Sequence, residues 1–458
     1  MATRAQRYEQ GRARRSACPR SSHAKWELRD PNVDPIALIE ASNVGRVPGL
    51  VPVRYARMAP SPFTFFRGSA MLEALDLRET PSSGIIVQLC GDCHIMNFGG
   101  FATPERNLVF DINDFDETFP GPWEWDVKRL AVSLVLAARD RGFAKSVARD
   151  AVLATVASYR ERLAEYAGYT PLDIWYTQLE LAALNVFFQR NADVFGGLEE
   201  AETFARAHTS ETAFPKLATV QNGHATIVDR PPLVYHFQEH VADWDAQIGK
   251  FFERYRESLS ADRRLLFDRY RFEDLAIKVV GIGSVGTRCT IALFIADETD
   301  ALFLQAKEAR RSVLEALDAK SPVANEGERV VDGQRLMQAA SDIFLGWAEF
   351  PGSHQNYYVR QLRDMKISVD IEKFRPRTLV DYGAICGWVL ARAHAKGGDG
   401  VAIAGYLGKG DGFDRAITAY APAYADQVEA DYDAFRDAIH SGRIRTETGD
   451  FTHQDFLP

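Results

Sequence analysis

The chain has 458 residues, a hydrophobic fraction of 46% and a charged fraction of 26%, an ordinary composition for a soluble globular protein. Its formal net charge of −9 argues against nucleic acid as the main partner. No apolar run reaches the roughly 18 residues that a membrane span needs. The five cysteines, an odd number without a secretory signal, favour a reducing cytoplasm over a disulfide framework. The length allows two or three domains, or one large two-lobed enzyme.

The first half of the chain is predicted to be mainly helical. Its Arg-rich first twenty residues are expected to form a flexible basic tail, because they lack the apolar core of a signal peptide. Two short runs rich in β-formers follow a helical stretch near Met71–Leu77, and apolar residues then recur with helical spacing. Residues 205–238 show little periodicity and are expected to form an irregular connection. The runs are Ile85–Leu89 and Asn107–Asp114, and the expected helices lie at 123–143, Lys145–Tyr166, Asp173–Arg190 and 240–259.

The character of the sequence changes at about residue 272, where three strand-like runs are joined by a glycine loop and a tight turn. A helix, a fourth strand and two further helices follow. A β-rich unit of about a hundred residues is therefore expected between two helical blocks. The strands are expected at 274–280, 288–296, 301–307 and 356–362, and the helices at 327–344, 381–395 and 413–440.

One short motif suggests a redox or haem protein. The string Cys90-Gly91-Asp92-Cys93-His94 fits C-x-x-C-H, the pattern that attaches c-type haem. Haem attachment of this kind normally happens outside the cytoplasm, and nothing in the sequence directs export. A dithiol site and a coincidental pair of cysteines both stay open.

A glycine-rich loop suggests a nucleotide site. Residues 281–286 read GIGSVG and fit G-x-G-x-x-G, a pattern shared by dinucleotide folds and kinase-like lids. The loop is followed by a strand-like run without a helix start, which favours the lid. The next strand ends at Lys307, where a lysine could pair with the α- and β-phosphates. Gly281, Gly283, Ser284, Gly286 and Lys307 are therefore candidate ATP ligands, and an ordinary glycine hairpin is the alternative.

Two acidic motifs could supply the rest of a phosphoryl-transfer site. Asp92 and Asn97 have the offset of the Asp and Asn in the kinase string H-R-D-x-x-x-x-N, where the carboxylate handles the hydroxyl proton and the carboxamide reaches a metal. Asp114 follows the second β-like run and is the expected second Mg²⁺ ligand beside Asn97. His94 and Asp116 are expected to support this site, and Asp126 to anchor the loop structurally. A surface turn is the alternative for the segment 113–118.

These segments resemble known families. The strings GDCHIMNFG, VFDINDFDET and GPWEWDVKRLA resemble the pattern of aminoglycoside-phosphotransferase-type kinases. The chain resembles more closely the bacterial family DUF2252, through SPFTFFRGSA, VVGIGSVGTRC, YYVRQLRDMK and IAGYLG over most of residues 50–435. The kinase-like resemblance implies an ATP- and Mg²⁺-dependent phosphotransferase and gives no acceptor.

The order of the motifs departs from that of ordinary kinases, because Asp92 and Asp114 precede the glycine loop and Lys307. The resemblance therefore implies an α+β, two-lobed, protein-kinase-like fold with a circularly permuted order. Gln361 and Leu362 would lie beside the adenine. The acidic partner of Lys307 stays unassigned, with Glu328 and Asp332 as the best-placed candidates. The expected divisions are an extension (1–49), a large lobe in two parts (50–260 and 363–440), a small lobe (265–362) and a tail (441–458).

The sequence thus predicts a cytoplasmic phosphotransferase with Asp92 as base, acting on ATP and an unknown hydroxyl acceptor, small molecule or protein. Three other functions stay open at this point: a silent nucleotide-binding regulator, a kinase-fold transferase of AMP, and a C-x-x-C redox or haem protein. No nucleic-acid partner and no membrane span are expected.

Overall fold

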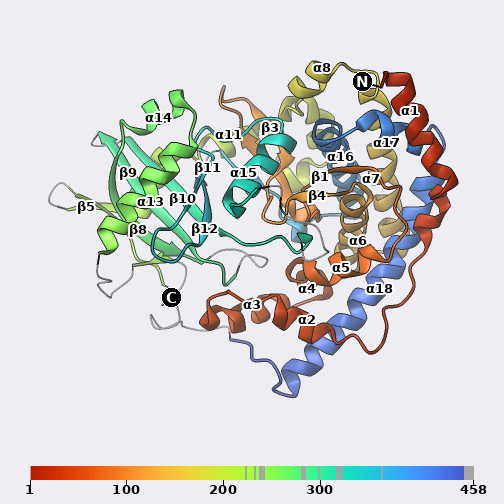
Figure 1. Cartoon of the computed structure of the whole chain (residues 1–458), viewed down its shortest axis with the longest axis horizontal. Helices are drawn as coiled ribbons and strands as arrows, with labels where there is room; N and C mark the ends of the chain where they lie inside the picture. The colour runs from red at the N-terminus through yellow and green to blue at the C-terminus, as the bar shows by residue number, and fades with distance from the viewer. Residues whose placement is uncertain are drawn as a thin grey trace.

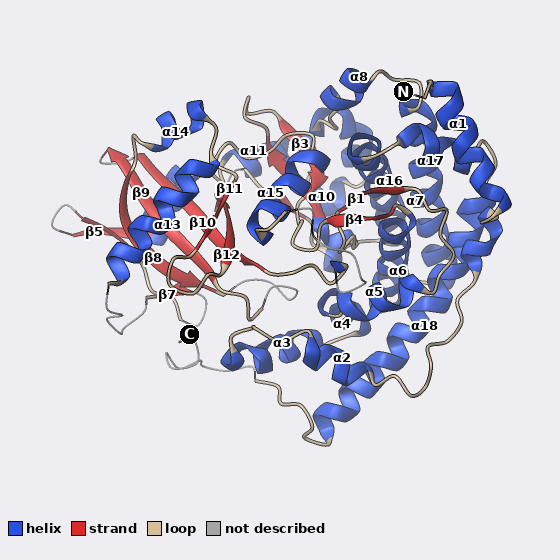
Figure 2. Ribbon diagram, viewed as in Figure 1, coloured by secondary structure: helices blue, strands red, loops and turns tan. Residues whose placement is uncertain are grey.

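The computed structural model describes most of the chain, namely residues 2–221, 224–231, 234–236, 243–279, 285–297, 300–315, 321, 323–362 and 365–447. It is a mixed α+β fold with two lobes side by side, one built on a sheet and one on helices (Figures 1 and 2). In the described part of the chain, no helix combines the length and the apolarity needed to span a membrane.

The helices are α1 (Arg4–Ala13), α2 (Pro35–Ala41), α3 (Val51–Met58), α4 (Pro62–Gly68), α5 (Ala70–Arg78), α6 (Glu124–Asp140), α7 (Lys145–Tyr166), α8 (Pro171–Tyr176), α9 (Asn185–Arg190), α10 (Ala192–Phe195), α11 (Leu198–Arg206), α12 (Ser210–Leu217), α13 (Trp244–Ser258), α14 (Ala261–Phe267), α15 (Glu326–Met337), α16 (Pro376–Gly397), α17 (Gly400–Leu407) and α18 (Gly412–His440). The strands are β1 (Ile86–Leu89), β2 (Phe98–Ala102), β3 (Leu108–Ile112), β4 (Phe119–Pro122), β5 (Ala218–Gln221), β6 (His224–Ile227), β7 (Val234–Tyr235), β8 (Arg271–Lys278), β9 (Cys289–Asp297), β10 (Asp300–Ala309), β11 (Gly346–Glu349), β12 (Asn356–Gln361) and β13 (Ile367–Ser368).

The sheet lobe is built on six antiparallel strands in the order β11-β12-β10-β9-β8-β7. Side chains alternate between its two faces, so neighbours in sequence face different layers. Tyr357 packs with Phe251 of α13 on one face. Tyr358, the next residue, belongs to the core that includes Val330 of α15. The side of the sheet that carries Tyr358 therefore faces the helical lobe.

The helical lobe is organised around α6, α7 and α16, which pack along one another, with α18 crossing them (Figure 1). Two small sheets, β1–β4 and β13-β2-β3, lie where this lobe meets α15 and the six-stranded sheet (Figure 2). One continuous hydrophobic core joins α6, α7, α16, α18 and α15. The strands that carry the acidic motifs are therefore held at the junction of the two lobes.

The N-terminal extension is not the flexible tail expected from its arginines. Helix α1 docks on α17, so the first and the last quarter of the chain lie side by side (Figure 1). The backbones approach so closely that a Cβ added at Gly11 would lie 1.9 Å from the Ala402 carbonyl oxygen. Arg15 donates to the carbonyls of Tyr406 and Gly405 at 2.7 and 2.5 Å, so its charge caps backbone oxygens rather than facing solvent.

Two further expectations differ from the structure. The single helix expected over Asp173–Arg190 is interrupted, because Glu180 forms an isolated bridge with Val109 and the Leu179 carbonyl accepts from the Phe110 amide at 2.8 Å. The connection expected to be irregular over 205–238 contains α12 and the hairpin β5–β6, which pack against the six-stranded sheet. With α13 on the same sheet, the sheet lobe begins before residue 260, earlier than the expected boundary.

Candidate functional site

The segment that follows β1 is fixed to helix α6 by one carboxylate. Asp126 accepts hydrogen bonds from the backbone amides of Cys90 and Gly91, at 2.9 and 3.1 Å. His394 of α16 places its Nε2 atom 3.2 Å from the same carboxylate. Because Asp126 is buried and these donors satisfy it, its role here is to hold the loop that carries Asp92.

Asp92 is oriented by a residue that the motif analysis missed. Arg129, one helical turn after Asp126 on α6, donates through Nε to Asp92 at 2.5 Å and through Nη1 to Glu73 at 2.5 Å. Burial raises the pKa of Asp92 above its usual range, although Arg129 acts in the opposite direction. A carboxylate with a raised pKa is better matched to proton transfer near neutral pH than an ordinary one. The spacing Asp126–Arg129 on one helix face was the signal in the sequence.

Asn97 ties this loop to the second acidic motif. Its Nδ2 atom donates to the Asp92 carbonyl oxygen at 2.6 Å. Its own carbonyl accepts from the Asn113 amide at 2.8 Å. The side-chain oxygen of Asn97 is the atom that could act as a ligand, and Asn113, which the Asn97 backbone binds, directly precedes Asp114.

His94 is buried beside Asp92, with 3.7 Å between its Nε2 atom and an oxygen of the Asp92 carboxylate. Burial lowers the pKa of His94 well below its usual range, so the ring is neutral. Its Nδ1 atom has no hydrogen-bond partner among the described residues. The ring therefore supports the loop by packing and by the position of its Nε2 atom beside the Asp92 carboxylate.

Asp114 and Asp116 follow β3 and stand close together. The Asp116 amide donates to the Asp114 carboxylate at 3.1 Å. Burial raises the pKa of Asp114, and the nearby charge of Asp116 raises it further. Two neighbouring carboxylates with incomplete charge compensation suit a divalent cation.

Lys307 meets this acidic pair from the other lobe. Its ammonium forms an ion pair with one oxygen of Asp116, and the Tyr358 hydroxyl donates to the other oxygen at 2.8 Å. The side chain of Lys307 is buried. Burial, the largest single effect, favours the neutral amine, but Asp116, Tyr358 and Asp114 together raise the pKa of Lys307, so the lysine is charged. Burial likewise disfavours the charged form of Asp116, whose pKa is nevertheless lowered by Lys307.

The acidic partner of Lys307 is thus Asp116, not a residue of helix α15. In the described part of the chain, neither Glu328 nor Asp332, the residues best placed by sequence, forms an ion pair or a hydrogen bond with the lysine, and Asp332 is exposed. Glu326 instead pairs with Arg329 at 2.6 Å, and Glu308 lies 3.4 Å from Arg288. Helix α15 contributes a cation to the junction rather than an acid.

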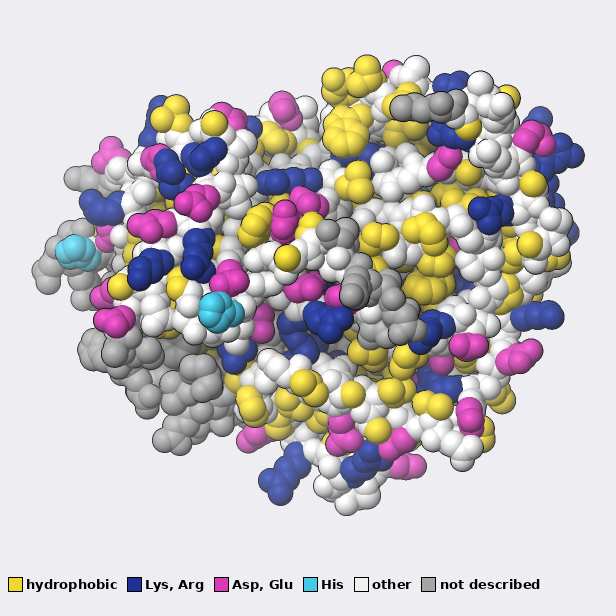
Figure 3. Space-filling model, viewed as in Figure 1, with side chains coloured by type: hydrophobic (Ala, Val, Ile, Leu, Met, Phe, Trp, Pro, Cys, Tyr) yellow, Lys and Arg dark blue, Asp and Glu magenta, His cyan; other side chains and the backbone are white. Residues whose placement is uncertain are grey.

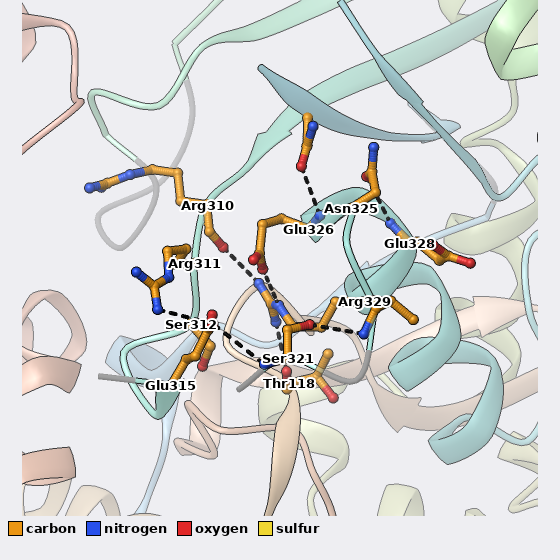
Figure 4. Close-up of polar contacts among 12 residues, drawn as sticks. Thr118, Arg310, Arg311, Ser312, Glu315, Ser321, Asn325, Glu326, Glu328 and Arg329 are labelled. Atoms are coloured by element: carbon orange, nitrogen blue, oxygen red, sulfur yellow. Dashed lines mark hydrogen bonds and ion pairs between the residues drawn. The ribbon is translucent and has the colours of Figure 1, made fainter. Parts of the chain in front are cut away.

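Arg329 is that cation, and it fastens α15 to both lobes (Figure 4). Its guanidinium donates to the carbonyls of Thr118, Asp116 and Arg310 at 2.6, 2.9 and 2.7 Å. The Arg310 carbonyl turns toward Arg329, whereas the Arg310 side chain points away from α15 (Figure 4). One buried side chain therefore sets the position of the acidic motif relative to the end of β10.

A cavity of about 270 Å³ opens at this junction. Asp92, Asp114 and Asp116 line it together with several arginines. Lys and Arg side chains gather in the middle of this face, between the sheet lobe and the helical lobe (Figure 3). The lining arginines are Arg46, Arg54, Arg67, Arg310 and Arg311.

The expected nucleotide loop is described only in part. Gly281, Gly283 and Ser284 lie outside the described residues. Gly286 has a φ of 90°, in the region that favours glycine, and its carbonyl accepts from the Val47 amide at 2.8 Å. The N-terminal segment therefore contacts the end of the loop, which the sequence did not reveal.

The backbone amides of the expected adenine contacts are hydrogen-bonded within the protein. The Gln361 amide donates to Asp342 at 2.5 Å, and the Leu362 amide donates to the Phe303 carbonyl at 2.9 Å. The cavity beside Gln361 has a volume of about 30 Å³. That is room for one or two waters rather than a base, so a nucleotide there requires Asp342 to move.

The cysteines of the C-x-x-C string are buried at the base of the loop. The sulfurs of Cys90 and Cys93 and an oxygen of Asp126 lie within 4.8 Å of one another. Burial raises the pKa of both thiols, that of Cys93 to about 11. Buried thiols with raised pKa are unreactive compared with catalytic or redox cysteines, and Asp126 already has its donors.

A divalent cation fits the oxygen ligands of Asp114 and Asn97 better than it fits the cluster of Cys90, Cys93 and Asp126. The hard oxygens of Asp114 and Asn97 are the ligand type that Mg²⁺ prefers. The raised pKa of Asp114 reflects burial and repulsion that a cation would relieve. Asp114 and Asn97 would hold the ion, with Asp116 kept by Lys307.

The fold and this site define a mixed α+β protein with a lysine–carboxylate centre and an arginine-lined cavity between two lobes. The chain belongs to the family described as "Uncharacterized protein conserved in bacteria (DUF2252)", whose model matches residues 46–438. Comparison with curated proteins and with solved structures gave no match.

Proposed function

We propose that this protein is an ATP- and Mg²⁺-dependent phosphotransferase with a circularly permuted kinase-like fold. One observation carries the proposal: Lys307, from the second strand after the glycine loop, pairs with Asp116, nearly two hundred residues earlier. Asp116 lines the cavity together with Asp92 and Asp114, so the lysine is bound to a residue of the cavity wall. A phosphate-pairing lysine, a base and metal ligands are the parts that phosphoryl transfer needs.

The end of helix α16 supports the permuted order. Gly398, just after this helix, forms an antiparallel bridge with Val87 of β1. In an ordinary kinase order this helix would lead into the loop that carries the base. Here its end lies beside the strand that leads into Asp92, so a break of the chain at this place would leave the site unchanged.

Each residue then has one role. Asp92, oriented by Arg129, accepts the proton of the acceptor hydroxyl. At the same time the oxygen of that hydroxyl forms a bond to the γ-phosphorus, and the bond between the γ-phosphorus and the ADP oxygen breaks. Lys307 neutralises the negative charge of the phosphates, either while it stays paired with Asp116 or after that ion pair has opened. Mg²⁺, held by Asn97 and Asp114, would supply charge neutralisation of the phosphates. The rate enhancement comes mainly from positioning and electrostatics.

The proposal is tested by ATP turnover of the wild type and of Asp114→Ala. Loss of the metal ligand is expected to lower turnover by about a hundredfold or more, by analogy with the loss of charge stabilisation in other active sites. Asp150→Ala, an exposed residue of α7 outside the cavity, is the matched control. Undiminished turnover of Asp114→Ala would contradict the assignment.

Mass spectrometry of the modified acceptor, with a cell extract of small molecules and proteins as the acceptor source, distinguishes the type of transfer. Added phosphate supports phosphotransfer, whereas added AMP would indicate the nucleotidyl transferase. Nucleotide binding without turnover would indicate a silent regulator.

A further inference from the structure

In the described part of the chain, Arg54, Arg67 and Arg310 of the cavity wall form no ion pair with a carboxylate, and Arg54 is buried. Arg54 donates to the Ser42 hydroxyl, the Asn43 side chain and the Gly68 carbonyl. Arg310 donates to the carbonyls of Ser42 and Val44. All these acceptors are neutral, so the contacts fix the guanidinium groups without cancelling their charge.

Arg67 is less constrained still. It lies on α4 and lines the cavity. Its Nε atom is buried and has no hydrogen-bond partner among the described residues. The guanidinium carbon lies 5.9 Å from the centre of the Phe63 ring, and the carboxylate of Asp92 acts on it through space without a hydrogen bond. A buried donor without an acceptor is costly, so its presence at a cavity suggests a ligand.

Burial makes these charges unfavourable in the absence of an anion. It lowers the pKa of Arg54 to about 10 and lowers that of Arg67. Arg54 is only 3% exposed. Guanidinium groups suit planar, bidentate recognition of phosphate and carboxylate, and are the residue of choice for desolvated anion sites.

Most carboxylates of the same cavity are hydrogen-bonded or ion-paired to groups other than these three arginines, and Asp114 accepts from the Asp116 amide. Asp92 is bound by Arg129, Asp116 by Lys307, and Glu308 by Arg288. Glu117 accepts from the Val313 amide at 2.7 Å. The carboxylates therefore have direct partners of their own, and the charges of Glu117 and Asp92 act on Arg54 and Arg67 only through space.

Strand β10 shows on which side of Lys307 the arginines lie. Gln361, the expected neighbour of the base, pairs with Leu304, and Arg310 follows the end of the same strand. Leu304 and Arg310 are three residues before and after Lys307, so each lies about 10 Å from it, in opposite directions along the strand. A nucleotide with its base toward Gln361 and its phosphates on Lys307 would leave the arginines beyond its terminal phosphate.

We propose that the acceptor carries a phosphate or similarly charged anionic group, which Arg54, Arg67 and Arg310 bind while its hydroxyl lies at Asp92. This inference rests on the proposed function, because it assigns the arginines to the second substrate. The reaction is the transfer described above: the acceptor oxygen binds the γ-phosphorus, ADP leaves, and the hydroxyl proton passes to Asp92. The same chemistry could come from the terminal phosphate of the nucleotide itself, which the test separates.

The test measures binding of inorganic phosphate by calorimetry, with and without a saturating, non-hydrolysable Mg²⁺–ATP analogue. The full-length wild type is expected to bind phosphate in both conditions. Arg67→Gln is expected to weaken phosphate binding by about tenfold or more, as loss of a hydrogen bond between charged groups predicts. Affinity for the Mg²⁺–ATP analogue should stay within about threefold of wild type.

Two further variants keep the result interpretable. Arg149→Gln, an exposed arginine of α7 paired with Asp150, is the control and should bind phosphate like wild type. Arg67→Lys retains the positive charge but loses the two parallel N–H donors of the planar guanidinium, so partial retention of phosphate binding is expected. Because the Arg67 guanidinium makes no hydrogen bond among the described residues, its replacement should leave the circular dichroism spectrum and the melting temperature unchanged.

The outcomes separate this inference from the proposed function. Phosphate that competes with the Mg²⁺–ATP analogue would overturn the inference, because the arginines would then hold the nucleotide's own phosphates. Equal phosphate affinity in wild type and Arg67→Gln, or no phosphate binding by the wild type, would also overturn it. Failure of the wild type to bind the Mg²⁺–ATP analogue would instead count against the proposed function, whatever the phosphate result.

Discussion

Asp92 shows how neighbouring groups can prepare one carboxylate for proton transfer. Arg129 fixes one of its oxygens, and Asn97 is bonded to its backbone carbonyl. Burial raises its pKa, which increases its basicity without leaving it unpaired. We expect Asp92→Asn to retain Mg²⁺–ATP binding and to lose about 10²- to 10⁴-fold in turnover, the range typical of a general base. Initial rates measure the turnover and calorimetry measures Mg²⁺–ATP binding, with Asp150→Asn as the control. Turnover at the wild-type rate by Asp92→Asn would contradict the role of Asp92 as general base.

The same residue predicts a pH dependence. A base must be deprotonated to act, so turnover should fall as the pH falls through the pKa of Asp92. Because burial raises that pKa, the acid limb should lie above the ordinary Asp value of 3.8. Turnover measured across the acid range gives the limb, after circular dichroism has shown that the protein stays folded at each pH. An acid limb at or below the ordinary value would contradict the raised pKa.

At the residue scale, the sequence predicted what lies within one short segment. The offset between Asp92 and Asn97, and the position of Asp114 after a strand, follow from local chain geometry. The contacts that make the site depend on tertiary packing: Arg129 with Glu73, Lys307 with Asp116, and the arginines from α3 and α4. The acidic partner of Lys307 is not on the following helix, because a closer acid, Asp116, comes from a segment nearly two hundred residues away.

At the scale of elements, the spacing of apolar residues predicted the helices that bury one long face. The expected helix Lys145–Tyr166 has the bounds of α7, because its apolar residues repeat against α16 over its full length. The helix expected over Asp173–Arg190 was wrong, because residues 179 and 180 hydrogen-bond or bridge to β3. Pairing with a strand from elsewhere overrides local helical preference, and a single sequence does not show the partner.

The N-terminal helix gives the clearest test at this scale. Replacing Gly11 by Val would place a Cβ atom 1.9 Å from the Ala402 carbonyl oxygen and force α1 away from α17. We expect a loss of about 1–3 kcal/mol in the free energy of unfolding, measured by denaturant titration, as is typical of overpacking. Gly249→Ala on α13 is the control, because nothing lies within 4 Å of its added Cβ and it should stabilise slightly. Unchanged stability in Gly11→Val would contradict a docked α1.

At the scale of the whole molecule, the site exists only because two lobes meet. Lys307 and Tyr358 come from the six-stranded sheet, whereas Asp92 and Asp116 follow strands at the edge of the helical lobe. Arg329 binds the backbone of both parts. A β-rich unit between two helical blocks was predictable from the change of pattern along the chain, and the two-lobed arrangement from the family resemblance. The sequence did not predict that the region beside Gln361 is closed, because Asp342 reaches Gln361 only through the tertiary fold.

The most direct test of the central claim is calorimetric titration of wild type and Lys307→Met with a non-hydrolysable Mg²⁺–ATP analogue. The account predicts one site per chain in the wild type and an affinity at least about tenfold lower in Lys307→Met, because a charged hydrogen bond to phosphate is lost. Lys250→Met, on the exposed face of α13, should bind like wild type. Absence of binding by the wild type, or equal affinity in Lys307→Met, would contradict a nucleotide site at this junction.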